Sequence, residues 1–183
     1  MRSHENEPVV IYREVKAVVV PAGQEVTLKP GQAGYITQAL GGSFTVYIDG
    51  NLYRLAGADA DAIGKEVLRI PELPLNATER DVLDAVWAQL RTCFDPEIPI
   101  NIVELGLVYD CAVHPKADGT RLVDIKMTLT APGCGMGPVI ADEARRKIAQ
   151  LSGVADADVQ VVWEPAWSPD RISEEGKKKL GMN

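Results

Sequence analysis

A short segment with two prolines constrains the fold of this chain more than any other feature. Residues 70–76 read IPELPLN, and prolines three positions apart prevent a regular helix or a central strand there. The residue pattern also differs on the two sides of the segment. We therefore predict two domains in the 183-residue chain, a small module at residues 1–72 and a larger domain at residues 75–183.

The first part has the pattern of β-strands and turns. Runs of valine, tyrosine, isoleucine and phenylalanine alternate with turn residues, among them Pro21-Ala22-Gly23, Lys29-Pro30-Gly31 and Asp49-Gly50. An Asp-Gly pair between two apolar runs is a strong hairpin signal. We predict a small all-β module of about five short strands.

The second part begins with a helical pattern. Thr78 can cap a helix, and Asp81, three residues further on, gives a variant of the capping box. Apolar residues then recur at helical spacing at Val82, Val86 and Leu90. This pattern predicts a helix that ends before Pro96 and Pro99.

Strand and helix patterns then alternate. Two alternating apolar runs at 107–113 and 123–129 flank Asp118-Gly119, which predicts a hairpin. A second helix follows, with Ile140, Ala144, Ile148 and Leu151 on one face and the pairs Asp142/Arg146 and Glu143/Lys147 on the other. Val159, Val161 and Trp163 predict a last strand. The order α-β-β-α-β predicts a two-layer α/β domain, with helices packed on one side of a small sheet.

Composition excludes several classes of function. The formal net charge of −7 disfavours nucleic acid as the main partner, because phosphate binding needs a basic face. No apolar run is long enough for a membrane span, and the first residues lack the apolar core of a signal peptide. Three cysteines, an odd number, disfavour a disulfide framework and favour a reducing cytoplasm.

Cys134 is the strongest candidate for chemistry. It stands between Gly133 and Gly135, after a strand pattern and before a helix pattern. Unpaired N–H groups and the helix dipole stabilise a thiolate at such a junction, and glycines leave its approach open. A thiolate binds metal or attacks an electrophile, so we predict an exposed and reactive sulfur.

The other two cysteines are weaker candidates. Cys111 alternates with apolar residues in a predicted strand, so we expect a buried, inert thiol. Cys93 is either a core residue or a second thiol near the site. It precedes Asp95-Pro96-Glu97-Ile98-Pro99, where two prolines stiffen a turn that carries two carboxylates. A helix stop explains Pro96 but not both carboxylates.

Three segments together resemble a known family. DPEIPINIVELGLVYD, MTLTAPGCGMGP and VVWEPAWSPDRIS are similar to motifs of the metal–sulfur cluster assembly factors, which include PaaD-like and cytosolic iron–sulfur targeting proteins. The β-rich first part resembles the longer SufT branch, which is associated with the SUF pathway.

The resemblance implies helices over a small mixed sheet and a role in maturing or delivering iron–sulfur clusters. It implies a functional site at Cys134, supported by Asp95, Glu97 and Thr130. Cys93 occupies a position that the wider family does not share. SUF-type assembly proteins and apo iron–sulfur client proteins are the implied partners.

Three hypotheses follow. In the first, Cys134 supplies one thiolate to a transient cluster or iron, completed by a second subunit of a homodimer, a small thiol or the recipient protein. A stable cluster usually needs four thiolates, and this chain has three cysteines. In the second, the chain is a metal-free adaptor that docks clients to the assembly machinery. In the third, Cys134 is the nucleophile of an enzyme with His114 or Glu97 as base.

Overall fold

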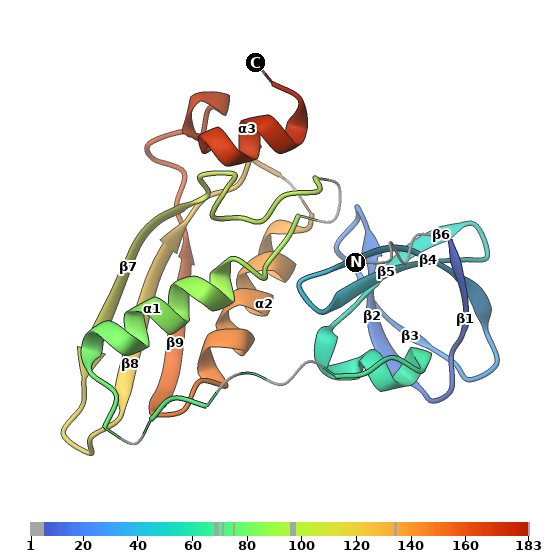
Figure 1. Cartoon of the computed structure of the whole chain (residues 1–183). Helices are drawn as coiled ribbons and strands as arrows, with labels where there is room; N and C mark the ends of the chain where they lie inside the picture. Colours follow the sequence, from blue (N-terminus) through green and yellow to red (C-terminus); the bar gives the residue numbers. More distant parts are fainter. Residues whose placement is uncertain are drawn as a thin grey trace. The chain divides into compact units, whose positions relative to one another are not determined.

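In the computed structural model the chain divides into two units, Met1–Arg69 and Ile70–Asn183. The structure describes residues 6–67, 70, 72–74, 76–95, 98–133 and 135–182. Each unit has its own sheet, and the two are described separately below (Figure 1).

The first unit is a six-stranded antiparallel sheet with the strand order β1-β4-β5-β6-β2-β3. Its strands are β1 (Glu7–Val10), β2 (Val15–Val20), β3 (Glu25–Leu28), β4 (Ala33–Leu40), β5 (Ser43–Ile48) and β6 (Asn51–Leu55). The expectation of about five strands is therefore wrong by one strand. The chain then forms the 3-10 helix η1 (Gly57–Ile63), whose apolar side chains join the core.

Local turn chemistry explains the hairpin between β5 and β6. Asp49 and Gly50 have φ values of 49° and 87°, and a two-residue hairpin turn with both angles positive matches the twist of the flanking strands. The predicted Asp-Gly hairpin is confirmed by the β5–β6 pairing, in which Ile48 lies opposite Asn51. The core of this unit includes Ile36, Val46 and Leu55, all of them fully buried.

The second unit has the predicted order of elements, followed by two short helices. They are α1 (Glu79–Leu90), β7 (Val108–Pro115), β8 (Arg121–Met127), α2 (Gly137–Ala149), β9 (Val154–Val161), η2 (Pro169–Arg171) and α3 (Glu174–Leu180). Strand β8 is central, antiparallel to β7 and parallel to β9, so the sheet is mixed. Helix α1 contacts β7 and α2, and α2 contacts β9 (Figure 1).

The helix patterns of the second unit are confirmed. Thr78 accepts a hydrogen bond from the Asp81 N–H while the Asp81 carboxylate accepts one from the Thr78 N–H, so the capping box is complete. Val82, Val86 and Leu90 are fully buried on one face of α1. Strand β9 ends at Val161, so the expected extension to Trp163 is wrong, and Trp163 is exposed.

Candidate functional site

The link between α1 and β7 carries the predicted acidic turn. Phe94 and Asn101 form an isolated antiparallel bridge, and the Ile102 N–H donates to the Cys93 carbonyl at 2.9 Å. The chain therefore folds back on itself around residues 95–100. Asp95 is 6% exposed within this fold-back. Glu97, the second predicted carboxylate, lies outside the described residues.

The link continues as a series of turns fixed by Asn101. Its side-chain oxygen accepts hydrogen bonds from the Val103 and Glu104 N–H groups at 3.0 and 2.9 Å. The Leu105 N–H donates to the Asn101 carbonyl, and the Leu107 N–H donates to the Ile102 carbonyl. Residues 101–107 of the link are therefore ordered by a series of hydrogen-bonded turns.

The segment after β9 holds this link from outside. The Trp167 indole N–H donates to the Leu105 carbonyl at 2.8 Å, and the Ser173 N–H donates to the Glu104 carbonyl at 2.9 Å. Gly106 has a φ of 69°, and a Cβ placed there would lie 2.2 Å from the Arg171 carbonyl oxygen. The two backbones approach so closely that only glycine fits.

Tyr109, at the start of β7, extends the same contact. Its hydroxyl donates to the Pro165 carbonyl at 2.7 Å, and the Arg171 guanidinium lies 4.5 Å from the centre of its ring. A cation over an aromatic face is attracted by the ring quadrupole. Residues 165–173 therefore fix both the link and the first residues of β7.

The cysteine loop, defined here as residues 128–136 between β8 and α2, is held mainly at its ends. At the first end, the Thr128 N–H donates to the Leu107 carbonyl at 2.8 Å. At the second, a Cβ on Gly137 would lie 2.2 Å from the Leu129 Cδ1, so a glycine lets the start of α2 pack directly on Leu129. Cys134 itself lies outside the described residues. Helix α2 begins at Gly137, three residues after it, with Met136 as N-cap.

The described residues inside the cysteine loop leave its surface open. Gly133 has a φ of 83°, which glycine adopts without strain, and a Cβ there would meet nothing within 4 Å. Thr130, the predicted supporting residue, is partly exposed. Thr128 is fully buried, and its hydroxyl has no hydrogen-bond partner among the residues that the structure describes.

Neither of the two described cysteines is an exposed thiolate, which is the form of cysteine that binds metal. Cys93 is fully buried, and its Sγ lies 3.7 Å from the Gln89 carbonyl oxygen, so it belongs to the core. Cys111 is half-buried, whereas full burial was expected. Burial, aided by the charge of Asp110, raises the pKa of Cys111 to about 11. Cys111 therefore keeps its proton at neutral pH.

A buried ion pair connects α2 to the end of α1. Lys147 Nζ lies 2.9 Å from the Glu143 carboxylate, which is 6% exposed, and donates to the Thr92 carbonyl at 2.8 Å and the Thr92 hydroxyl at 3.0 Å. The predicted pairing is confirmed, but the pair lies against the α1 end rather than on a solvated face. The second predicted pair, Asp142 and Arg146, forms at 3.0 Å with both side chains about half exposed.

Other polar groups take structural roles. His114 lies on the exposed surface of β7, and its Nε2 is 3.0 Å from the Asp124 carboxylate. Within the described part of the chain, no three His, Cys, Asp or Glu side chains gather closely enough to hold a metal ion. None of the helices in that part has the length and apolar character needed to cross a membrane.

Comparison with known proteins identifies the family. A model of the family described as iron–sulfur cluster assembly protein matches residues 83–161. An Fe-S protein maturation auxiliary factor of Bacillus subtilis, YitW, is 40% identical over 104 residues, which cover 57% of this chain and 98% of that protein. The chain belongs to the iron–sulfur cluster assembly protein family.

Two further family members show the same extent of match. An Fe-S protein maturation auxiliary factor of Porphyromonas gingivalis is 40% identical over 105 residues, 57% of this chain and 92% of that protein. The factor SufT of Staphylococcus aureus is 43% identical over 89 residues, 49% of this chain and 97% of that protein. All three are named auxiliary factors, and none carries the name of an enzyme.

The family match lies entirely within the second unit of the chain. It includes Cys93, Asp95, Glu97, Thr130 and Cys134, and it begins after the first unit has ended. The matches use 92–98% of the three relatives, so these proteins have no room for a six-stranded module. The first unit is therefore an addition to the part that this chain shares with them.

Sequence reasoning missed two features near the site. In the sequence Thr128 stands at the end of an apolar run. A single threonine at such a position does not indicate that its hydroxyl is buried. The contact of Lys147 with Thr92 joins residues 55 positions apart, so only the fold brings them together. The i,i+4 spacing of Glu143 and Lys147 predicted that they form an ion pair, but it did not indicate that the ion pair is buried.

Proposed function

We propose that this protein is an iron–sulfur cluster maturation factor that holds a cluster transiently and passes it to client proteins. Cys134 supplies a thiolate ligand, and Asp95, Glu97 and Thr130 support the site. The observation that carries this proposal is the family match, which includes all four residues. The second unit acts as a two-layer α/β domain that presents the cysteine loop at one end of its sheet.

The described part of the cysteine loop supports a reachable sulfur. A Cβ placed on Gly133 would meet no atom within 4 Å, and α2 begins three residues after Cys134. The first turn of a helix leaves N–H groups unpaired and carries partial positive charge, which favours a thiolate nearby. In this proposal Asp95 and Glu97 of the link act as oxygen ligands or accept hydrogen bonds from the site.

The thiol inventory supports transient rather than permanent binding. A resident cluster is usually held by four cysteine thiolates. Cys93 is buried in the core and the free Cys111 thiol keeps its proton at neutral pH, so Cys134 is the cysteine best suited to ligate the cargo, and one thiolate falls short of four. A second subunit, a small thiol or the recipient protein would complete the ligand set. An incompletely enclosed cluster is easily released.

SUF-type assembly proteins and apo iron–sulfur proteins are the partners that this proposal requires. A reducing cytoplasm is the compartment in which a thiolate of this kind stays available. A metal-free adaptor is the alternative, because the chain has an additional β-module that is suited to docking. In that case the family residues would bind proteins rather than cargo.

Anaerobic reconstitution with iron and sulfide tests the proposal. Wild type is compared with Cys134→Ser and with Cys111→Ser, a matched control at a protonated thiol. We expect charge-transfer absorption, bound iron and transfer to an apo acceptor in wild type and Cys111→Ser, and loss of all three in Cys134→Ser. Full transfer by Cys134→Ser would refute the carrier function. Maturation of clients in cells without any bound iron in vitro would favour the adaptor.

A further inference from the structure

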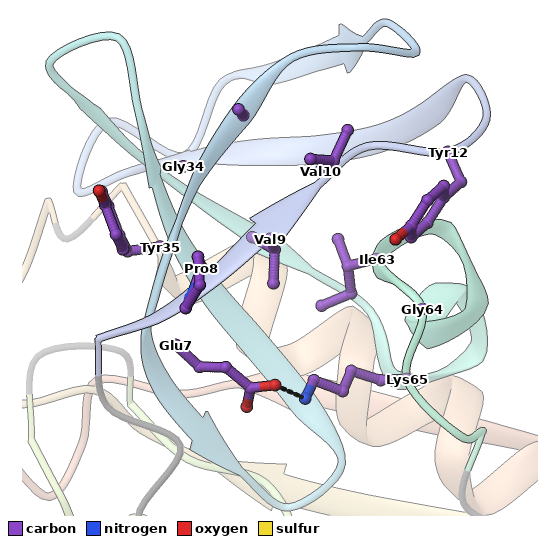
Figure 2. A pocket seen from close by; sticks show the side chains of 11 residues that line it. Glu7, Pro8, Val9, Val10, Tyr12, Gly34, Tyr35, Ile63, Gly64 and Lys65 are labelled. Carbon is purple, nitrogen blue, oxygen red and sulfur yellow. Dashed lines mark hydrogen bonds and ion pairs between the residues drawn. The ribbon is translucent and has the colours of Figure 1, made fainter.

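The first unit contains a pocket that the family match does not explain. Its volume is about 500 Å³, and it lies between strand β1 and residues 63–65 at the end of η1. Figure 2 shows the residues of β1 on one side and Ile63, Gly64 and Lys65 on the other. The pocket therefore follows the length of one strand.

Strand β1 is an edge of the six-stranded sheet, with β4 on one side only. The Ile11 N–H donates to the Gln32 carbonyl on the β4 side at 2.8 Å, and the Tyr12 N–H points the other way and donates to the Ala62 carbonyl at 2.8 Å. N–H groups two residues apart point to the same side of an extended chain. The Val10 N–H therefore points to the open edge, as the Tyr12 N–H does.

This edge already accepts a backbone partner at one end. Ala62 pairs with Tyr12, but the described residues show no such partner for Val10, two positions earlier along the same edge. Pro8, two positions earlier again, has no N–H. A row of backbone groups without partners is a template for a further strand.

The walls of the pocket combine aromatic and apolar side chains with polar groups. Tyr12 and Tyr35 are 67% and 52% exposed, and Figure 2 shows them on opposite sides of the pocket with Val9 and Ile63 between them. Exposed tyrosines are enriched where proteins bind one another, because a rigid ring offers both an apolar face and a polar end. The exposed side chain of Val10 adds to this surface.

The charges of the pocket select against ionic ligands. Its charged side chains are Glu7 and Lys65, which form an ion pair with each other. Their sum is neutral, so the pocket offers no net field for a phosphate, a nucleic acid or an anionic cluster. A segment without charged side chains, which brings both apolar side chains and backbone polar groups, complements this distribution.

We propose that this pocket binds an uncharged, extended peptide segment of a partner protein, which adds as a strand to the open edge of β1. The Val10 N–H donates to a carbonyl of the segment, and its alternate side chains contact Tyr12 and Tyr35. Main-chain hydrogen bonds supply affinity in this mode of recognition, and side-chain pockets supply specificity. The inference concerns the first unit and is independent of the function proposed for Cys134.

Amide shifts of the full chain in NMR spectra test the binding. The probe is an acetylated and amidated Lys-Thr-Val-Thr-Val-Thr-Lys peptide, whose terminal lysines lie outside the pocket and provide solubility. We expect shifts at Val10 and Tyr12 at peptide concentrations up to about 1 mM, where weak docking is measurable. Two further peptides carry N-methyl groups on the valines or on the threonines. We expect one of them to bind at least about tenfold more weakly, because it lacks the donors that face β1.

Matched variants identify the contacts. Val10→Pro removes the outward N–H, which an edge strand tolerates, and also the valine side chain, whereas Val10→Thr changes the side chain but keeps the N–H. Tyr35→Ala is compared with Tyr47→Ala, because Tyr47 is similarly exposed but does not line the pocket. We expect several-fold weaker binding for Val10→Pro and Tyr35→Ala and little change for the two controls.

Three outcomes would overturn the inference. The first is the absence of shifts at Val10 and Tyr12. The second is equal binding of all three peptides, which would indicate side-chain contacts without strand addition. The third is a dimer in sedimentation that Val10→Pro dissociates, which would assign the pocket to a second copy of this chain.

Discussion

The acidic link at residues 91–107 and the cysteine loop at residues 128–136 flank the same sheet but are held very differently. The link has its own turns, capped by Asn101, and is fixed from outside through Glu104 and Leu105. The described residues of the cysteine loop are anchored at its two ends, through the hydrogen bond of Thr128 to Leu107 and through the buried side chains of Leu129 and Met136 beside the start of α2. The link is thus fixed along residues 101–107 by contacts from another segment, whereas the described contacts of the cysteine loop lie at its ends.

The largest expected effect concerns the glycines of the two segments. Gly106→Ala in the link adds left-handed strain and a clash with the Arg171 backbone, and should reduce the free energy of unfolding by about 3 kcal/mol or more. Gly133→Ala in the cysteine loop adds the strain without a clash, and should cost about 1–2 kcal/mol. Denaturant unfolding of both variants measures the difference. Equal losses would mean that the two segments are held alike.

The second test concerns the buried ion pair at the start of the link. Lys147→Met leaves the Glu143 carboxylate buried without this cation and removes two hydrogen bonds to Thr92, so we expect a loss of about 3 kcal/mol. The matched control on the same helix, Arg146→Met, removes a half-exposed pair with Asp142 and should cost about 0–1 kcal/mol. Thermal and denaturant unfolding measure both. A small loss in Lys147→Met would show that α2 does not fix the link.

A smaller effect, of opposite sign, is expected where the cysteine loop begins. Thr128→Val removes a buried hydroxyl for which the described part of the chain provides no partner, and it keeps the shape, so it should stabilise the protein by about 1 kcal/mol. The same substitution at Thr78 removes a helix cap and should destabilise the protein by about 1 kcal/mol. Denaturant midpoints of the two variants should therefore move in opposite directions. A loss of stability in Thr128→Val would show that its hydroxyl has a partner in solution.

Features set by neighbouring residues could be predicted from the sequence. The Thr78–Asp81 cap and the turns at Asp49-Gly50 and Asp118-Gly119 depend on residues a few positions apart, and the structure contains all three. The apolar stripes of α1 and α2 follow from the helical repeat for the same reason. The site residues that the family motifs predicted all lie within residues 83–161, which the family model matches.

Features that depend on distant residues could not be predicted. The turns of the link are held by Trp167, 62 positions from Leu105, so no local pattern predicted them. The β1–β4 pairing joins a proline-containing segment to a strand far along the chain, and the strand count was therefore too low. Cys111 lies on the edge strand β7, which has a neighbouring strand on one side only, so its alternation with apolar residues did not bury it fully.

The alkylation rate of individual cysteines in the intact, reduced protein tests the central claim most directly. Iodoacetamide reacts with the thiolate, so mass spectrometry across a pH series reports both pKa and access for each sulfur. Cys111, with a pKa of about 11, should react slowly at pH 8 and faster only as the pH rises toward that value. We predict that Cys134 reacts fastest and is already reactive at pH 7. A Cys134 that reacts no faster than Cys111 at pH 7 would contradict a presented thiolate in the cysteine loop.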